Sequence, residues 1–445
     1  MRFQRVVSSC LGLLLLVVFC NAFLGGSPAI AQSEATLYHF GGGTDGGAPE
    51  AGLIFDRQGN LYGSTSGGGI IGGCELGLGC GTVFELSPST GGGWTLATLY
   101  TFQGGSDGAG PAGPLLMDVS GNLFGETLGG GHSGGNCLEA GCGTVFELSP
   151  DGSGGWVKQT LYMFQVVSDG NAPYGGLALD SAGNLYGTTI QGGGICSETK
   201  AGCGTAFELI PQAGGHWLEA IIHRFGSGRD GYAPAAGFAF DGKGNLVSST
   251  ALGGLTSANC PLGCGIVFEL TLSGGQWQEQ ILHSFDFTDG SDPQATPVPD
   301  SAGNVYVTTY EGGSGLGGTV VELSPQPGAT WWRPQVLHEF AFSAGVLPRV
   351  GAMLSGGNLY GVTEYGGNNA QPCRSDTDNG CGVVYEMSKT ASGEWQYRVL
   401  YRFSGGQDGN YPVGVPVIDT LGNLYGTTLY RGQTLDTGTV FEVKP

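Results

Sequence analysis

The chain has 445 residues, of which 89 are glycine and only 12% are charged. Each glycine inside a helix costs about 1 kcal/mol relative to alanine, so this composition excludes a mainly helical protein. A hydrophobic content of 40% argues against disorder, and a net charge of −21 makes nucleic acid an unsuitable partner, because such a surface repels phosphate.

The first 31 residues are typical of a secretory signal peptide. An apolar run, residues 11–19, follows two arginines, and an A-x-A cleavage site occupies residues 29–31. The apolar run is short for a membrane anchor, and a bulky phenylalanine before Cys20 disfavours lipidation of that cysteine. We therefore expect export, with no membrane span after cleavage. The mature protein, residues 32–445, would be secreted or extracellular, with the periplasm as the alternative.

Residues 173–225 contain the structural unit of the chain. Within it are four short runs rich in β-branched or aromatic residues, namely 176–180, 184–189, 204–210 and 217–225. Asp180-Ser-Ala-Gly183 has the residues of a type I turn, so the first two runs are expected to pair as a hairpin. The link between the second and third runs is the long one.

Six other segments repeat this unit at intervals of 55–63 residues. The repeats are marked by the last aromatic residue of the fourth run, at Phe40, Phe102, Phe164, Phe225, Phe285, Phe340 and Phe403. A fixed period with about four strands per unit predicts either a propeller or an open array.

The two ends of the chain distinguish a closed ring from an open array. The last unit lacks a fourth run, whereas residues 35–40 form a fourth run with no unit before them. An open array would leave both as exposed strand edges. We therefore predict an all-β fold, a single-domain seven-bladed β-propeller with four antiparallel strands per blade. Residues 34–41 would complete the last blade by pairing beside residues 438–443, and a β-solenoid is the alternative.

Two recurring motifs carry a family resemblance. G-N-L-Y-G-T-T, a glycine-rich stretch and C-G-T-V-F-E-L-S-P together resemble the GloVer tandem repeat of exported bacterial proteins, known as choice-of-anchor proteins. The resemblance covers the whole mature chain and implies export and a propeller-like fold, without implying an activity. Anchored members carry C-terminal sorting signals, whereas here no hydrophobic tail follows the last repeat, so we expect release. The strand order is similar, more loosely, to NHL-type propellers.

Ten cysteines remain in the mature chain, and all lie between the second and third runs of a blade. They form close pairs, Cys74/Cys80, Cys137/Cys142, Cys196/Cys203, Cys260/Cys264 and Cys373/Cys381. Blades five and seven have none in this loop, so the cysteines are present or absent as pairs. That pattern predicts local disulfides in an oxidising compartment. Zinc is the alternative, but it usually takes four ligands, and most pairs have no histidine beside them.

An Asp-Gly pair recurs in the link from the fourth run to the next blade. The six aspartates are Asp45, Asp107, Asp169, Asp230, Asp289 and Asp408. In an antiparallel blade this link opens on the same face as the cysteine loop, so acidity and variability meet on one rim, around the channel mouth. We hypothesise that these carboxylates bind Ca²⁺ or a cationic or polyhydroxylated ligand. A plain turn is the alternative, because aspartate and glycine are common turn residues.

Three further recurring sets are interpreted as structural. One glutamate per blade lies in the third run, too widely spread around the ring for paired catalysis. His223, His283 and His338 replace tyrosine in the outermost strand of successive blades, where one zinc ion could not reach them all. The tryptophans that open the fourth run are expected to pack between blades; they are Trp94, Trp156, Trp217, Trp277, Trp332 and Trp395.

The sequence contains no nucleophile elbow, no H-E-x-x-H motif and no phosphate-binding loop. We therefore expect a monomeric binding or scaffold module outside the cell, with a glycan or protein ligand and with Ca²⁺ as the candidate cofactor. An enzyme acting on extracellular polysaccharide, a hydrolase or lyase using loop carboxylates, is one alternative. A purely structural cell-surface protein is the other.

Overall fold

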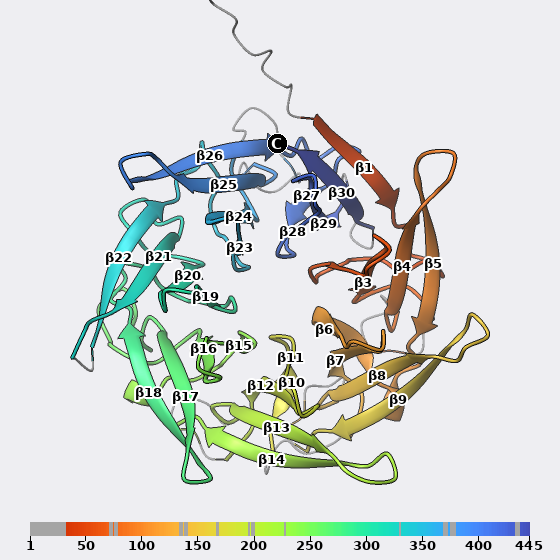
Figure 1. The fold of residues 1–445 in the computed structure, drawn as a ribbon, viewed down its shortest axis with the longest axis horizontal. Helices are drawn as coiled ribbons and strands as arrows, with labels where there is room; N and C mark the ends of the chain where they lie inside the picture. Colours follow the sequence, from red (N-terminus) through yellow and green to blue (C-terminus); the bar gives the residue numbers. More distant parts are fainter. Residues whose placement is uncertain are drawn as a thin grey trace, which may run out of the picture.

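The computed structural model shows a closed ring of seven β-sheets around a central channel (Figure 1). The predicted signal peptide lies outside the residues that the structure describes. These residues are 33–70, 74, 79–132, 137, 141–165, 169–194, 196, 201–226, 228–328, 331–367, 373, 380–431 and 437–445. They contain two single-turn 3₁₀ helices, η1 (Gly105–Asp107) and η2 (Gly228–Asp230), and no α-helix. Accordingly, the described part offers no helix with the length and apolarity to cross a membrane.

Each sheet is a blade whose antiparallel strands follow one another outward from the channel. Blade one contains β2 (Ile54–Phe55), β3 (Leu61–Thr65), β4 (Thr82–Pro88) and β5 (Trp94–Thr101). Blade two contains β6 (Ala109–Met117), β7 (Leu123–Gly129), β8 (Thr144–Pro150) and β9 (Trp156–Met163). Blade three contains β10 (Asn171–Pro173), β11 (Ala178–Leu179), β12 (Leu185–Gln191), β13 (Thr205–Pro211) and β14 (Trp217–Arg224).

Blades four to seven continue the order. Blade four contains β15 (Ala239–Phe240), β16 (Leu246–Thr250), β17 (Ile266–Ser273) and β18 (Gln276–Ser284), and blade five contains β19 (Val298–Pro299), β20 (Val305–Thr309), β21 (Thr319–Pro325) and β22 (Trp332–Glu339). Blade six contains β23 (Met353–Ser355), β24 (Asn358–Thr363), β25 (Val383–Lys389) and β26 (Trp395–Arg402). Blade seven contains β27 (Asn410–Pro412), β28 (Val417–Ile418), β29 (Leu424–Tyr430) and β30 (Thr439–Lys444). The predicted seven-bladed propeller is therefore confirmed.

The N-terminal strand closes the ring, as the sequence predicted. Strand β1 (Ser33–His39) pairs antiparallel with β30, from Ser33 opposite Lys444 to His39 opposite Thr439. Beyond the strand, the N–H of Phe40 donates to the carbonyl of Gly438 at 3.0 Å. In Figure 1 the red and dark blue strands lie side by side, so segments from the two ends of the chain form one blade.

The hairpin between the two inner strands is built on an aspartate. In blade three, Oδ1 of Asp180 accepts from the N–H of Ala182 and of Asn184, at 2.8 and 2.9 Å. Gly183 follows with a φ of +90°, as expected for a type I turn continued by a left-handed residue. The inner strand β11 is shorter than the predicted run 176–180, and a further inner strand that was not predicted, β10, precedes it at residues 171–173.

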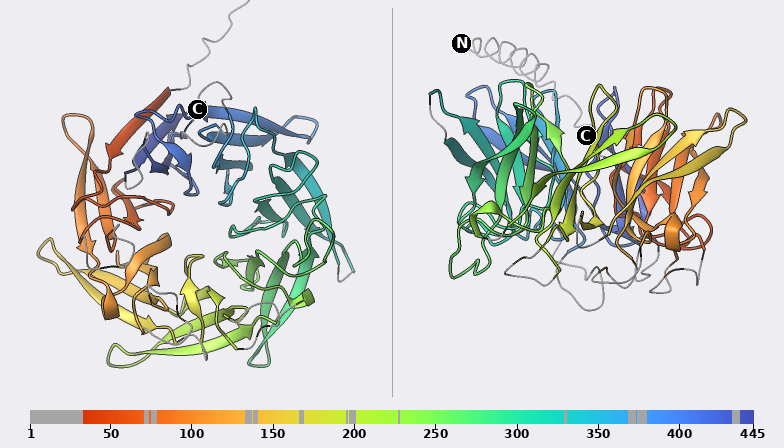
Figure 2. Two further views of the ribbon diagram at one scale, coloured as in Figure 1. Left: turned by 180° about the vertical axis from the view of Figure 1, so that it is seen from behind. Right: turned by 90° about the horizontal axis from the view of Figure 1, so that it is seen from below.

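The core lies between the blades. Phe40 of blade seven meets Phe84 of blade one edge-on at 5.1 Å, and the phenylalanines that mark the repeat are buried. Trp156 of blade two packs on Tyr62 of blade one, with ring centroids 6.3 Å apart. The predicted interblade role of the tryptophans is therefore seen here, and the side view in Figure 2 shows the blades standing around the channel.

Candidate functional site

In each blade the chain reaches the wall of the central channel at a residue–proline pair, and the residue before the proline has an uncommon backbone conformation. The residue before the proline has a φ between +52 and +60° at Ala48, Gly110, Ala172, Ala233, Asp292, Leu347 and Tyr411. A proline normally pushes its predecessor toward extended conformations, so this geometry needs support from its surroundings. In blade three the support is a hydrogen bond from the N–H of Ala172 to the carbonyl of Cys142, 3.0 Å away in blade two.

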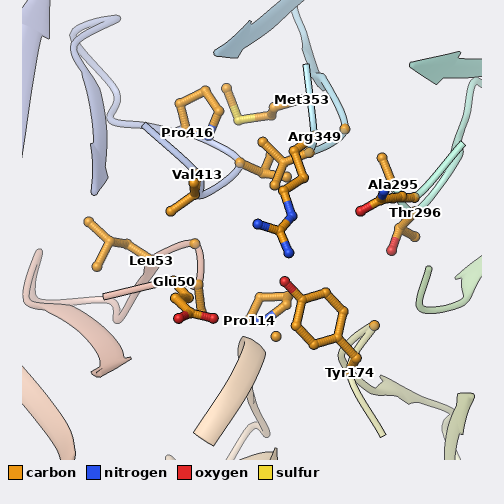
Figure 3. Close-up of a pocket in the computed structure, with 18 of the residues that line it drawn as sticks. Glu50, Leu53, Pro114, Tyr174, Ala295, Thr296, Arg349, Met353, Val413 and Pro416 are labelled. Carbon is orange, nitrogen blue, oxygen red and sulfur yellow. The ribbon is translucent and has the colours of Figure 1, made fainter. Parts of the chain in front are cut away.

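The residue after this proline lines the central cavity in six of the seven blades. These residues are Glu50, Tyr174, Ala235, Gln294, Arg349 and Val413. The cavity has a volume of about 970 Å³, counted with the solvent at its mouth. All seven blades contribute to its wall, and Leu53, Pro114, Val413 and Met353 make part of that wall apolar. The channel is therefore a mainly apolar pocket with a few polar groups (Figure 3).

Arg349 is the cation of this pocket. Its guanidinium points into the cavity toward the hydroxyl of Tyr174 (Figure 3), and Cζ lies 6.0 Å from the centroid of the Tyr174 ring. Behind it, Nη1 lies 3.7 Å from Oε1 of Glu364, a side chain only 7% exposed. The hydroxyl of Tyr310 donates to Oε2 of Glu364 at 3.0 Å. Glu364 is therefore fixed by two partners and in turn orients Arg349.

Two acidic groups shape the electrostatics of the pocket. Glu50 lines the cavity and accepts a hydrogen bond from Oγ of Ser66 at 2.9 Å. Burial raises the pKa of Glu364, while the positive charge of Arg349 opposes that rise. The charges of Glu50 and Glu364 both act on Arg349, so one cation faces two carboxyl groups. The pocket is thus poorly suited to an anionic ligand.

A third acidic group supports the wall next to Arg349. Asp292 precedes the proline of blade five, and Nε2 of Gln294 donates to its Oδ2 at 2.8 Å. Burial raises the pKa of Asp292 to about 6, although the hydrogen bond from Gln294 opposes that rise. The side chain of Gln294 is thus held against the wall of the cavity that it lines.

The six aspartates of the Asp-Gly pairs are held at blade boundaries. Each accepts a hydrogen bond from a backbone N–H of its own loop, such as that from Gln103 to Asp107 at 2.9 Å. Each carboxylate also contacts the tyrosine or histidine two residues before the repeat phenylalanine. The pairs are Tyr38–Asp45, Tyr100–Asp107, Tyr162–Asp169, His223–Asp230, His283–Asp289 and Tyr401–Asp408.

These contacts place the aspartates beside the outermost strands, one at each of six boundaries, rather than at the cavity. Across the part of the chain that the structure describes, one cluster gathers three metal-ligating side chains, namely His223, Asp230 and Glu279. Five of the six aspartates are outside that cluster. Binding of Ca²⁺ by the six aspartates stays a prediction.

The ten cysteines form five disulfides in the pairs that their spacing predicted. The bonds join Cys74–Cys80, Cys137–Cys142, Cys196–Cys203, Cys260–Cys264 and Cys373–Cys381, with Cα atoms 4.8 to 5.4 Å apart. In all five, the carbonyl of the second cysteine accepts the N–H of the residue before the next blade's proline. Each disulfide therefore fixes a backbone acceptor that supports the channel wall.

The three histidines pack as single aromatic residues in separate blades. His223 meets Phe225 edge-on at 4.7 Å, and His283 meets Phe285 at 4.8 Å. His338 stacks on Tyr397 with ring centroids 3.9 Å apart. The prediction that they do not share one zinc ion agrees with this arrangement.

Sequence reasoning missed the residues of the cavity. Glu50, Tyr174 and Arg349 occupy one repeat position but share no chemical character, so nothing marks them as a set. The signal that could have found them is the proline before each of them, which recurs a few residues after every Asp-Gly pair or its equivalent. Aligning the seven prolines would have brought the variable residues into one column.

Comparisons with known proteins give one family model that matches the chain and several structures that resemble it distantly. The family model described as the Gloeobacter/Verrucomicrobia repeat matches residues 28–260 and 247–445. No curated protein matches the chain. Among solved structures, an oxidoreductase described as a glucose dehydrogenase from Thermus thermophilus is similar at 16% identity and a TM-score of 0.39, covering 74% of this chain and 95% of that one.

Two further structures are similar at the same distant level. A nidogen/laminin complex matches at 16% identity and a TM-score of 0.38, covering 65% of this chain and 83% of that one. An ancestral GH74 enzyme matches at 11% identity and a TM-score of 0.48, covering 88% of this chain and 48% of that one. At these identities the similarity concerns the fold alone.

Proposed function

The chain is a member of the Gloeobacter/Verrucomicrobia repeat family, and from this premise we propose that it is an extracellular binding module whose ligand enters the central cavity. The observation that carries the proposal is the cavity wall, in which Arg349, Tyr174 and Glu50 converge within a mainly apolar surface. Ligand sites of proteins commonly have this composition. The five disulfides support export, because such bonds persist in oxidising compartments.

The ligand that fits this chemistry is a small neutral, polyhydroxylated group such as the end of a glycan. Tyr174 offers an aromatic ring, while Arg349 and Glu50 offer a donor and an acceptor of hydrogen bonds. An anionic ligand is less suitable, because Glu50 and Glu364 already offset the charge of Arg349. The net charge of −21 would also repel an anion before it reached the channel.

Binding without turnover is favoured over hydrolysis. Glycoside hydrolases usually place two carboxyl groups on either side of the bond that is cleaved, about 5–10 Å apart. Of the described residues that line the cavity, Glu50 is the one with a carboxyl group. Glu364 lies behind Arg349 and is bound by Tyr310. The module is therefore expected to retain a glycan unchanged.

A glycan array followed by titration calorimetry tests the proposal. Tyr174→Ala removes the aromatic wall without leaving a buried charge, and should weaken binding of a selected glycan about tenfold or more. Trp331→Ala is the matched control, because it removes an exposed aromatic side chain that does not line the cavity, and it should bind as the wild type does. Equal affinity for Tyr174→Ala and wild type, or an array with no retained glycan, would contradict the proposal. Release of shortened products would favour the enzyme instead.

A further inference from the structure

The boundaries between blades repeat one arrangement of three side chains. The first is the tyrosine or histidine two residues before the repeat phenylalanine, the second is the aspartate of the Asp-Gly pair, and the third comes from the outer strand of the next blade. Between blades one and two these are Tyr100, Asp107 and Lys158. Nζ of Lys158 lies 2.9 Å from Oδ1 of Asp107, with the lysine side chain only 4% exposed. This boundary therefore holds a buried cation beside its aspartate.

Between blades three and four the same three positions hold His223, Asp230 and Glu279. A carboxylate thus stands where the other boundary has the ammonium of Lys158. Nε2 of His223 lies 3.2 Å from Oδ1 of Asp230 and 4.0 Å from Oε1 of Glu279. One ligand atom from each of the three side chains lies within 4.8 Å of the other two.

Glu279 shares a side-chain hydrogen bond with Asp230, but this packing leaves one of its carboxyl oxygens without a partner. It is 13% exposed, and its Oε1 is buried with no hydrogen-bond partner among the described residues. A buried carboxyl oxygen without a partner is costly, so either a proton or a cation must compensate the pair of carboxylates.

We propose that His223, Asp230 and Glu279 bind one zinc-type divalent cation that joins blade three to blade four. Imidazole nitrogen and carboxylate oxygens are ordinary zinc ligands, at about 2.0–2.2 Å, which sets tetrahedral ligands about 3.3 Å apart. The 3.2 Å pair matches that spacing, and the 4.0 Å between Nε2 of His223 and Oε1 of Glu279 exceeds it by about 0.7 Å. The side chain of Asp230 is 29% exposed, so water can supply the fourth ligand.

Neighbouring boundaries show why this one is distinct. Between blades two and three the positions hold Tyr162, Asp169 and Glu219, which lack an imidazole. Between blades four and five they hold His283, Asp289 and a proline, which lack the third ligand. Calcium prefers six to eight oxygen ligands, a set that a site with one imidazole and two carboxylates does not offer. The proposal is therefore specific to one boundary and to one type of cation.

Zinc titration of the metal-free protein by calorimetry tests the proposal, with melting temperature as a second measurement. His223→Tyr introduces the residue found at Tyr100, and Glu279→Lys introduces the residue found at Lys158. Each introduced side chain therefore already occupies the same position at another blade boundary of this chain. His283→Tyr is the matched control, because it removes a histidine from the next boundary. Near-ultraviolet circular dichroism confirms that each variant is folded.

The expected result is one zinc ion per wild-type chain, bound with a Kd in the micromolar range or tighter, and a Tm rise of about 2 °C or more in excess zinc. Both effects should disappear in His223→Tyr and in Glu279→Lys and persist in His283→Tyr. Unchanged zinc binding in folded His223→Tyr would overturn the proposal. So would a folded wild-type protein that binds no zinc, or equal losses in all three variants.

Discussion

The ring of Pro173 packs directly on the backbone of Gly143, across the boundary between blades two and three. A β-carbon added to Gly143 would lie 2.5 Å from Cδ of Pro173 and 2.4 Å from the carbonyl oxygen of Thr127. Gly143 also follows Cys142, whose carbonyl holds the N–H of Ala172. The glycine of the C-G-T motif is therefore required because the next blade's proline occupies the space of a side chain.

This contact predicts that Gly143→Ala is strongly destabilising. Gly143 has a φ of +92°, so alanine is strained there by about 1–2 kcal/mol, and the clash with Pro173 adds about 1–3 kcal/mol. Gly121→Ala is the matched control, because its φ is +86° and nothing lies within 4 Å of an added β-carbon. Urea unfolding should show a clearly larger loss for Gly143→Ala. Equal losses would mean that backbone strain alone decides both.

The buried ion pair between Lys158 and Asp107 predicts a second stability effect. Lys158→Met keeps most of the apolar stem but removes the ammonium, and leaves Asp107 with one partner fewer in a partly buried place. We expect a loss of about 1–3 kcal/mol in the free energy of unfolding. Lys243→Met, at an exposed turn, should change it by less than about 0.5 kcal/mol. Similar denaturant midpoints for the two variants would show that the pair contributes nothing.

The architecture could be predicted because it rests on features that recur. The repeat phenylalanine recurs in all seven blades, the Asp-x-x-Gly turn in six and the paired cysteines in five, so one unit predicts the course of the whole ring. The closing strand followed from an unpaired fourth run at one end and a missing one at the other. Its register, with Ser33 opposite Lys444, could not be read, because a hairpin turn does not connect the two strands.

The cavity and the blade boundaries could not be predicted because both depend on side chains from different blades. The residue before each proline adopts a left-handed conformation that its neighbour in sequence disfavours. Hydrogen bonds to two blades hold it there: the N–H of Ala233 donates to the carbonyl of Cys203 in the preceding blade, and its carbonyl accepts from the N–H of Ala251 in its own blade. The aspartates were expected around the channel mouth. Their carboxylates lie further out because residues such as Tyr100 on the outer strand and N–H groups of the same loop bind them.

Ring closure predicts a large effect from a short deletion. Removing residues 33–40 would leave β30 as an exposed edge and would take Phe40 away from Phe84. The melting temperature should fall by several degrees, more than the loss of a loose terminus would cause. Removing Pro445 alone, an exposed terminal residue, is the control. A melting curve that is the same for both truncations would show that β1 does not hold the ring closed.

The buried carboxyl group of Glu126 predicts that stability depends on pH. Glu126 is 1% exposed, and its Oε2 accepts the N–H of Gly176, next to the cavity residue Gly175, at 2.9 Å. Burial raises its pKa from 4.5 to about 8, although that hydrogen bond opposes the rise. Between these two values the folded state binds a proton that the unfolded state has lost. The free energy of unfolding contributed by this group therefore falls as the pH rises from about 5 to about 8.

Glu126→Gln tests this dependence, because glutamine keeps an acceptor for Gly176 but does not ionise. We expect the variant to gain stability relative to the wild type as the pH rises, by up to about 1.4 kcal/mol per pH unit within that interval. Urea unfolding at several pH values between 5 and 8 measures the difference, and Glu394→Gln serves as an exposed control. A constant difference between Glu126→Gln and wild type would mean that Glu126 ionises at the same pH in both states. In that case the wall at Gly175 would rest on a charged carboxylate rather than on a neutral carboxyl group.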